Sequence, residues 1–316
     1  MLFIENYQDA KDYHNGLLKC WFNSKLYTET ERRNNQFQCT IRNCPSCVKD
    51  RKYYSKTLHE DIRRLIKQNI DCILTGEVGQ LVEFYETNSS LLNENSLEIE
   101  NFFVNSAYKN FFQTNCAEEF LNLLNKNTCI YCNRNYTLAI VKGRTRAEID
   151  HWLPKTHFPI FAVSFYNLIP SCHSCNHLKG AGEDAEWWVK NHKEIANPYS
   201  DKGTFDFNYT FSKSKNEFEI TFENVSNPKI RRMIKENRLR EIYSAHREFE
   251  LRDLHELRLK YPDNYLKDLL AKTFSTSISE EEKYRLIFGI DKNEENFHKR
   301  PLSKFKNDII KKLLSL

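Results

Sequence analysis

The sequence predicts an α+β fold in which a small unit of strands and one helix lies between two mainly helical regions. Apolar residues recur every three or four positions over much of residues 1–128 and again from Pro228, which is the period of an amphipathic helix. At Tyr136 the period changes to two, as in a half-buried strand. Two Cys-x-x-Cys pairs, at 129–132 and 172–175, enclose this change. Together these observations predict three parts, residues 1–126, 127–182 and 183–316.

The N-terminal part is expected to be mainly helical. Its apolar period predicts helices over four segments, 56–68, 79–87, 97–112 and 117–126. Residues 88–96, with the sequence NSSLLNENS, are rich in residues that favour turns, so a loop is expected there. The run Gln38–Lys49 interrupts the helical pattern with three cysteines and a proline.

The central part is expected to fold as strand, turn, strand, long loop and helix. The run TLAIV from Thr137 predicts a first strand, and RAEIDH predicts a second strand that ends at His151. Gly143 supplies the backbone freedom that the tight turn between them needs. Ser171 is a suitable N-cap for a helix over CHSCNHLKG, with Gly180 or Gly182 closing that helix.

The C-terminal part combines a hairpin with helices. Alternating residues predict two strands within 205–224. The helical period returns over four segments, 229–259, 263–273, 279–288 and 301–315, with prolines at 262 and 301 as boundaries.

The composition excludes some classes of protein. No stretch reaches the roughly 18–20 apolar residues of a membrane helix, and the N-terminal run turns polar after Ile4, so neither a membrane span nor a signal peptide is expected. We therefore expect a cytoplasmic protein with no membrane partner. Cytoplasmic thiols stay reduced, so clusters among its ten cysteines indicate metal binding rather than disulfides. Basic runs at 42–67, 228–260 and 297–316 could attract phosphates or simply form solvated helix faces.

The doubled Cys-x-x-Cys spacing predicts a structural zinc site. Two residues between thiols let both sulfurs of a pair face one ion, and two pairs complete a tetrahedral set. The expected ligands are Cys129, Cys132, Cys172 and Cys175. Thirty-nine residues separate the pairs, so the zinc would enclose another unit rather than a minimal ribbon. Buried or free cysteines are the simpler alternative.

Several polar residues lie inside this zinc-closed segment. In a strand ending at His151, Glu148 and Asp150 point to one face and His151 to the other. At the strand's end this alternation can relax, so Asp150 and His151 could address one cleft. A helix starting near Cys172 would bring Asn176 across from Asp150.

The run from CIYC at 129 to LKG at 180 resembles the zinc-stapled HNH (ββα-metal) endonucleases. The resemblance covers about residues 127–181 and rests on the Asp-His pair, the Asn-Leu at 167–168 and the Cys-x-x-Cys-Asn that ends in Lys-Gly. It implies metal-dependent hydrolysis of phosphodiester bonds. The chain departs from the His-Asn-His lettering at its first and last positions, which leaves the preferred cation open.

The resemblance also implies roles for individual residues. His151 would be the general base that takes a proton from the attacking water. Asp150 and Asn176 would ligate the catalytic ion, and oxygen ligands favour Mg²⁺ or Mn²⁺. Asn167 would bond to the backbone of the long loop and hold His151 in place.

Neighbouring residues have weaker predictions. Arg134 and Lys179 are candidate phosphate contacts. Glu148 could ligate metal, orient His151, or be an ordinary carboxylate on a strand face. His173 or His177 could add a metal ligand.

A second metal site is a further expectation. Its core is the spacing Cys39-x4-Cys44-x2-Cys47. The fourth ligand stays open among three residues, Cys20, His14 and His59.

The C-terminal run over 280–314 is similar to the tails of bacterial HNH proteins encoded beside AAA- or ABC-type ATPases in anti-phage defence, Septu-like systems among them. This implies a partner ATPase. The expected function is a DNA endonuclease that acts in defence. One alternative is an RNA nuclease, for instance against tRNA, because attack by water leaves the site unchanged. The other is a non-catalytic zinc-stapled module that binds nucleic acid. It predicts decay at 150, 151 or 176, which the sequence does not show.

Overall fold

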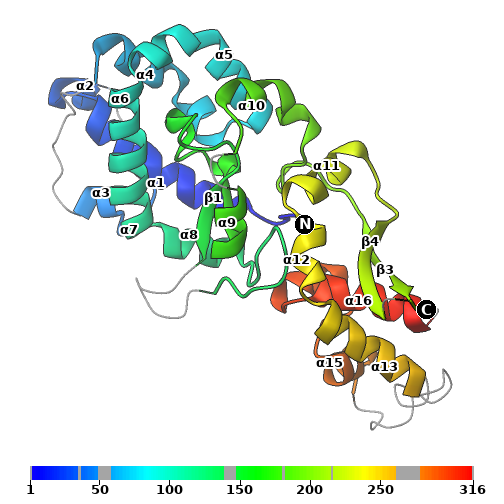
Figure 1. The fold of residues 1–316 in the computed structure, drawn as a ribbon. Helices are drawn as coiled ribbons and strands as arrows, with labels where there is room; N and C mark the ends of the chain where they lie inside the picture. Colours follow the sequence, from blue (N-terminus) through cyan, green and yellow to red (C-terminus); the bar gives the residue numbers. More distant parts are fainter. Residues whose placement is uncertain are drawn as a thin grey trace.

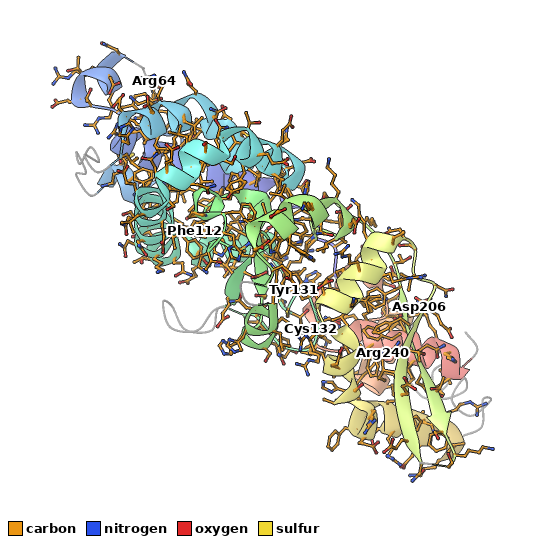
Figure 2. The ribbon with its side chains drawn as sticks, turned by 45° about the horizontal axis from the view of Figure 1, so that its top comes forward. Arg64, Phe112, Tyr131, Cys132, Asp206 and Arg240 are labelled. Carbon is orange, nitrogen blue, oxygen red and sulfur yellow. The ribbon has the colours of Figure 1, made fainter. Side chains whose placement is uncertain are left out.

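The computed structural model describes residues 2–34, 37–48, 58–138, 147–179, 182–214, 216–260 and 278–314. These residues are mostly helical and contain two small two-stranded antiparallel sheets, which fits the predicted α+β class. The N-terminal helices gather at one end of the molecule, and the C-terminal helices and second sheet at the other (Figure 1). Tyr131 and Cys132 lie between them (Figure 2). The boundaries at 126/127 and 182/183 stay predictions.

The N-terminal helices pack around α1, which the sequence pattern did not single out. Its buried Trp21 and Phe22 pack against the aromatic rings of Phe102 and Phe103. Asn15 and Gly16 in the middle of α1 weaken its helical pattern. The elements of this region are α1 (Gln8–Leu26), α2 (Glu29–Asn34), α3 (Pro45–Val48), α4 (Glu60–Thr75), α5 (Val78–Glu94), α6 (Ser96–Ile99), the wide π-helix η1 (Glu100–Phe112), α7 (Gln113–Asn115) and α8 (Ala117–Leu124).

The loop predicted over residues 88–96 is wrong, because α5 continues to Glu94. The side chains of Asn88 and Ser89 donate hydrogen bonds to carbonyl groups of the preceding helical turn. Residues that often break a helix are therefore satisfied within it. Leu92 is buried and holds this last part of α5 against the core.

Among the described residues, the strand ending at His151 pairs with a segment that was not predicted as a strand. β1 (Glu148–His151) pairs antiparallel with β2 (Leu168–Ser171), which follows the long loop. All four residues of β2 are buried, and a fully buried strand shows no alternation from which to predict it. Of the predicted strand TLAIV, Thr137 and Leu138 are not in a strand, and the rest lies outside the described residues.

Helix α9 (His173–Lys179) follows β2 and completes a strand–loop–strand–helix unit. Ser171 does not cap it, contrary to prediction. Ser171 is the last residue of β2, and its buried hydroxyl has no hydrogen-bond partner among the described residues. The loop between the strands contains two short 3₁₀ turns, η2 (Pro159–Phe161) and η3 (Phe165–Asn167).

In the C-terminal part the hairpin is confirmed, with β3 paired to β4. The segment 229–259 is helical but divided, since Arg238 adopts a left-handed conformation with φ 48°. Predicted helix 263–273 lies outside the described residues, and α10 was not predicted. The elements are α10 (Ala185–Asn191), η4 (His192–Glu194), β3 (Asp206–Ser212), β4 (Glu217–Glu223), α11 (Pro228–Glu236), α12 (Leu239–Ser244), η5 (Arg247–Leu251), α13 (Arg252–Lys260), α15 (Glu280–Phe288), η6 (Glu294–Lys299) and α16 (Ser303–Leu314).

Among the described helices, none combines the length and the apolar composition that a membrane crossing requires.

Candidate active site

The four cysteines of the two Cys-x-x-Cys pairs meet in one buried cluster. Their sulfur atoms all lie within 4.8 Å of one another, and the Sγ atoms of Cys132 and Cys172 are 3.9 Å apart. Sulfurs placed 2.3 Å from a central zinc ion would have tetrahedral edges of about 3.8 Å. The donor set therefore fits a structural zinc ion, which would tie the knuckle at 129–132 to the start of α9.

A second cluster contains Cys20, Cys39, Cys44 and Cys47, whose sulfurs also lie within 4.8 Å of one another. This second donor set also suits structural zinc. Of the three candidates for the fourth ligand, Cys20 is the one in place. His14 is buried among aromatic rings, and His59 accepts a hydrogen bond at the start of α4.

The first zinc knuckle is also a docking point for the C-terminal part. The backbone carbonyl of Cys132 accepts a hydrogen bond from the buried hydroxyl of Tyr243. Asn133, at φ 50°, donates its side-chain amide to the carbonyl of Phe297 and accepts at its own carbonyl from the N–H of Leu302. Asn tolerates this left-handed conformation better than most residues.

Glu148 lies on the face of β1 that meets α9. Its Oε2 accepts from Asn176 Nδ2 at 2.7 Å, and its Oε1 lies 2.7 Å from His173 Nδ1. Partial burial raises the pKa of Glu148, but the hydrogen bonds from Asn176 and His173 outweigh it and the net shift is downward. Asn176 was predicted to lie across from Asp150. It instead lies across from Glu148, the neighbouring carboxylate on the same face of β1. His177 stacks on the ring of His173.

Asp150 is buried and receives two short hydrogen bonds on the same oxygen. Tyr131 donates its hydroxyl to Oδ2 at 2.6 Å, and Lys179 Nζ lies 2.6 Å from the same atom. Tyr131 occupies a spacer position of the first Cys-x-x-Cys pair, so the zinc knuckle delivers this hydroxyl to β1. Burial and the neighbouring carboxylate raise the pKa of Tyr131 well above its usual value, which keeps the hydroxyl protonated as a donor.

Lys179 is enclosed rather than directed at solvent. Its Nζ also donates to the carbonyl oxygens of His151 and Trp152, at 2.6 and 3.0 Å. The rings of Tyr131 and Trp188 flank it at 5.9 and 5.6 Å, close enough for cation–π attraction. Burial lowers the pKa of Lys179 against the opposing pull of Asp150. We therefore assign Lys179 to the carboxylate and do not retain it as a phosphate contact.

His151 points to the opposite face of β1, into the long loop. Its Nε2 lies 2.9 Å from the carbonyl of Ala162. Because a carbonyl only accepts, Nε2 carries the proton and the lone pair of the neutral ring is on Nδ1. Burial lowers the pKa of His151 to about 3, with a smaller contribution from Lys155, so the ring is neutral near pH 7. Tyr108 on η1 packs edge-on against the ring, with centroids 4.5 Å apart.

Asn167 is fully buried and holds the long loop closed. Its Oδ1 accepts from the N–H of Leu153, and its Nδ2 donates to the carbonyls of Leu153 and Phe161. The backbone carbonyl of Asn167 accepts from the N–H of Trp152, the residue after His151. These bonds join both ends of the loop beside His151.

Arg134 is engaged inside the protein. Its guanidinium donates to the carbonyl of Ile242 and lies 3.3 Å from His246 Nε2. It therefore docks α12 onto the knuckle, and we do not retain it as a phosphate contact.

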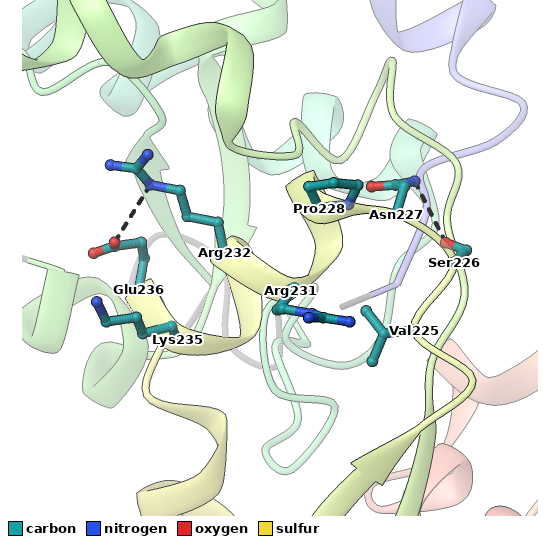
Figure 3. A pocket seen from close by; sticks show the side chains of 8 residues that line it. All are labelled: Val225, Ser226, Asn227, Pro228, Arg231, Arg232, Lys235 and Glu236. Atoms are coloured by element: carbon teal, nitrogen blue, oxygen red, sulfur yellow. Dashed lines mark hydrogen bonds and ion pairs between the residues drawn. The ribbon is translucent and has the colours of Figure 1, made fainter.

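A surface hollow of about 690 Å³ lies on α11 and does not include the candidate residues (Figure 3). Arg231, Arg232 and Lys235 line it, but Arg232 is already paired with Glu194 and Glu236. The hollow belongs to the C-terminal part rather than to the site at β1.

Sequence reasoning missed three residues that contact the site. The position of Tyr131 within a Cys-x-x-Cys pair was an available signal. Tyr108 gave none, because η1 lies far from β1 in the sequence. Trp188 gave none because α10, the helix after α9, was not predicted.

Comparison with curated proteins finds similarity over part of the chain. Over 57 residues the chain is 35% identical to the Septu protein PtuB of Bacillus thuringiensis, covering 18% of this chain and 21% of the relative. Over 64 residues it is 41% identical to protein ea31 of Escherichia phage lambda, covering 20% of each chain. The chain thus spans about a fifth of the length of these curated relatives. No family model and no solved structure matches it.

Proposed function

We propose that this chain is a metal-dependent endonuclease of the HNH (ββα-metal) type that hydrolyses phosphodiester bonds, with DNA as the expected substrate. One observation carries the proposal. Within the described residues, the side chains of Asp150, His151 and Asn176 each make their hydrogen bonds through one polar atom, and a second polar atom of each is left for chemistry. Such preorganisation is what a hydrolytic site requires.

Asp150 and Asn176 supply the cation ligands in this proposal. Within the described residues, the hydrogen bonds to Asp150 reach Oδ2 and that of Asn176 uses Nδ2. The Oδ1 atom of each side chain remains, and carboxylate and amide oxygens suit Mg²⁺ or Mn²⁺. When bound, such an ion would offset the charge that builds on the phosphate as the bond breaks. Both carboxylate oxygens of Glu148 are engaged, so Glu148 orients Asn176.

His151 is the general base in this proposal. The hydrogen bond to Ala162 fixes its tautomer, so Nδ1 is the atom that takes a proton from water. A pKa near 3 makes the neutral ring the resting state but a weak acceptor. The negative charge of a bound phosphodiester would raise this pKa, because a nearby anion favours imidazolium.

A role in bacterial defence is the second part of the proposal. The similarity to the Septu protein PtuB supports it. In that setting a partner ATPase would restrain or direct the nuclease, and the C-terminal part, joined to the zinc knuckle through Asn133, is the region through which such a partner would act.

Cleavage assays with the purified full chain test the proposed activity. Supercoiled plasmid and total tRNA would each be incubated with Mg²⁺, with Mn²⁺ and without divalent ion. We expect cation-dependent nicking of plasmid that His151→Ala abolishes and that His14→Leu, which alters another buried histidine, retains. Zinc content and circular dichroism would show that both variants fold. If the chain cleaves tRNA but not plasmid, the substrate is RNA rather than DNA.

Undiminished cutting by His151→Ala would refute the base assignment. Asp150→Ala should weaken divalent-ion binding, measured by calorimetry. Unchanged affinity would remove Asp150 as a ligand.

A further inference from the structure

The second cysteine cluster lies within the N-terminal part, between α1 and residues 37–48. Cys20 projects from α1, and the other three sulfurs come from residues 37–48, including the short helix α3. The Sγ atoms of Cys20 and Cys47 are 3.4 Å apart, and none of the ten cysteines is paired in a disulfide.

The local backbone around Cys44 has the geometry of a metal-binding knuckle. The N–H of Cys47 donates to the carbonyl of Cys44, which makes a tight turn between the two ligands. Asn43, at φ 55°, sets the entry to this turn.

Residues 37–47 have almost no hydrophobic core of their own. Cys44 and Ser46 are the buried residues of this described stretch, and α2 before it buries none. Ile41 packs against α1 at Gly16, where a Cβ atom would lie 2.8 Å from the Ile41 side chain. Ordering the segment costs about 1–2 kcal/mol of entropy per residue, and so small a buried surface offsets only part of it. A bound metal ion would add folding energy here.

We propose that Cys20, Cys39, Cys44 and Cys47 bind a second zinc ion, which fastens residues 37–48 to α1. Metal binding supplies the folding energy that the segment lacks, as in other small units without a core. Four thiolates leave no open position, so this ion is structural. The proposal is independent of the nuclease activity proposed above.

The two sites differ in how accessible their ligands are. All four cysteines of the first cluster are buried, whereas Cys47 is exposed and Cys39 is half-buried in the second. A chelator can therefore approach the second ion more readily. The second site should lose its metal first, while the zinc that holds the knuckle to α9 is retained.

Metal analysis of the full chain tests the proposal. By inductively coupled plasma mass spectrometry we expect two zinc ions per wild-type chain and one in Cys44→Ser. Cys72→Ser, a half-buried cysteine outside both clusters, is the matched control and should keep two. Challenge with a chromogenic chelator should release zinc from wild type in two equal phases, of which Cys44→Ser lacks the fast one.

Three results would overturn the proposal: one zinc per wild-type chain, iron in place of the second zinc, or equal zinc content in wild type and Cys44→Ser. Titration of free thiols in the unfolded protein separates metal loss from disulfide formation, and paired disulfides at these positions would also reject a zinc site. If Cys44→Ser does not fold, the same zinc measurement is made on Cys47→Ala, because Cys47 is exposed. This variant should also lose one zinc ion.

Discussion

Replacing Lys179 with methionine tests whether the end of β1 depends on a buried ammonium group. The side chains of Lys179 and Asp150 are 13% and 5% exposed, and their charged atoms are 2.6 Å apart. Methionine retains much of the apolar stem but donates no hydrogen bond. Asp150 would then keep the Tyr131 hydroxyl as its donor, and the carbonyls of His151 and Trp152 would lose theirs.

Removing one partner of a buried ion pair costs about 3–5 kcal/mol, because the remaining charge stays in a poorly solvating interior. We expect Lys179→Met to lower the free energy of unfolding by this amount, measured by urea denaturation of zinc-loaded protein. Lys190→Met is the matched control. Lys190 also pairs at 2.6 Å from a helix, with Glu186, but these side chains are 68% and 74% exposed. Its loss should cost less than about 1 kcal/mol.

The double variant Asp150→Asn/Lys179→Met separates the charge effect from lost packing. With both charges gone, part of the loss should be recovered, giving a coupling energy of about 1–3 kcal/mol. Similar losses for Lys179→Met and Lys190→Met, or strictly additive losses in the double variant, would refute the reasoning.

The same variant bears on the proposed cation. If Asp150 ligates Mg²⁺, the ion replaces the missing positive charge, and stability rises with the concentration of a ligand that binds the folded state. Millimolar MgCl₂ should therefore stabilise Lys179→Met more than wild type. No stabilisation of the variant by Mg²⁺ or Mn²⁺ would count against Asp150 as a ligand.

Three further predictions concern Tyr131, His14 and Cys132. Tyr131→Phe removes a hydrogen bond to the buried Asp150 carboxylate, so unfolding free energy should fall by about 1.5–3 kcal/mol and plasmid cleavage about tenfold or more, with zinc retained; exposed Tyr136→Phe should change neither. Burial lowers the pKa of His14 from 6.5 to about 3, so below pH 6.5 the unfolded chain binds a proton that the folded chain does not. The free energy of unfolding therefore decreases as the pH is lowered. His14→Leu should reduce this loss of stability between pH 7 and pH 5 by about 2 kcal/mol, measured by urea denaturation at each pH. Cys132→Ser should yield little folded protein, judged by circular dichroism and solubility, because zinc binding is folding energy here; a folded variant with normal zinc content would contradict this.

Local spacing predicted much of the candidate site. The Cys-x-x-Cys pairs converge in one cluster, and the alternation along β1 puts Glu148 and Asp150 on one face. Asn176 and Lys179 are three residues apart on α9, so they share a helix face. They therefore contact neighbouring carboxylates of β1. These predictions could be made because each uses only the spacing of residues within one Cys-x-x-Cys pair, one strand or one helix.

The contacts that could not be predicted depend on which residues are buried and on how elements pack against one another. β2 has no alternating pattern because both of its faces are covered. Lys179 looked like a surface cation, since nothing in its neighbours along the chain indicates Trp188 or the carbonyls that enclose it. The register of α9 against β1 decided which carboxylate faces Asn176, and that register is set by packing in three dimensions.

The turn of the first Cys-x-x-Cys pair contacts both the end of β1 and the C-terminal part. Tyr131 donates to Asp150, the carbonyl of Cys132 accepts from Tyr243, and Asn133 binds the C-terminal backbone. These are consecutive residues of one tight turn, so they cannot move independently while the sulfurs are held. A displacement of the C-terminal part at Asn133 would therefore shift the hydroxyl on Asp150 as well. The turn at 131–133 is thus one physical connection between the end of β1 and the segment from α12 to Leu302.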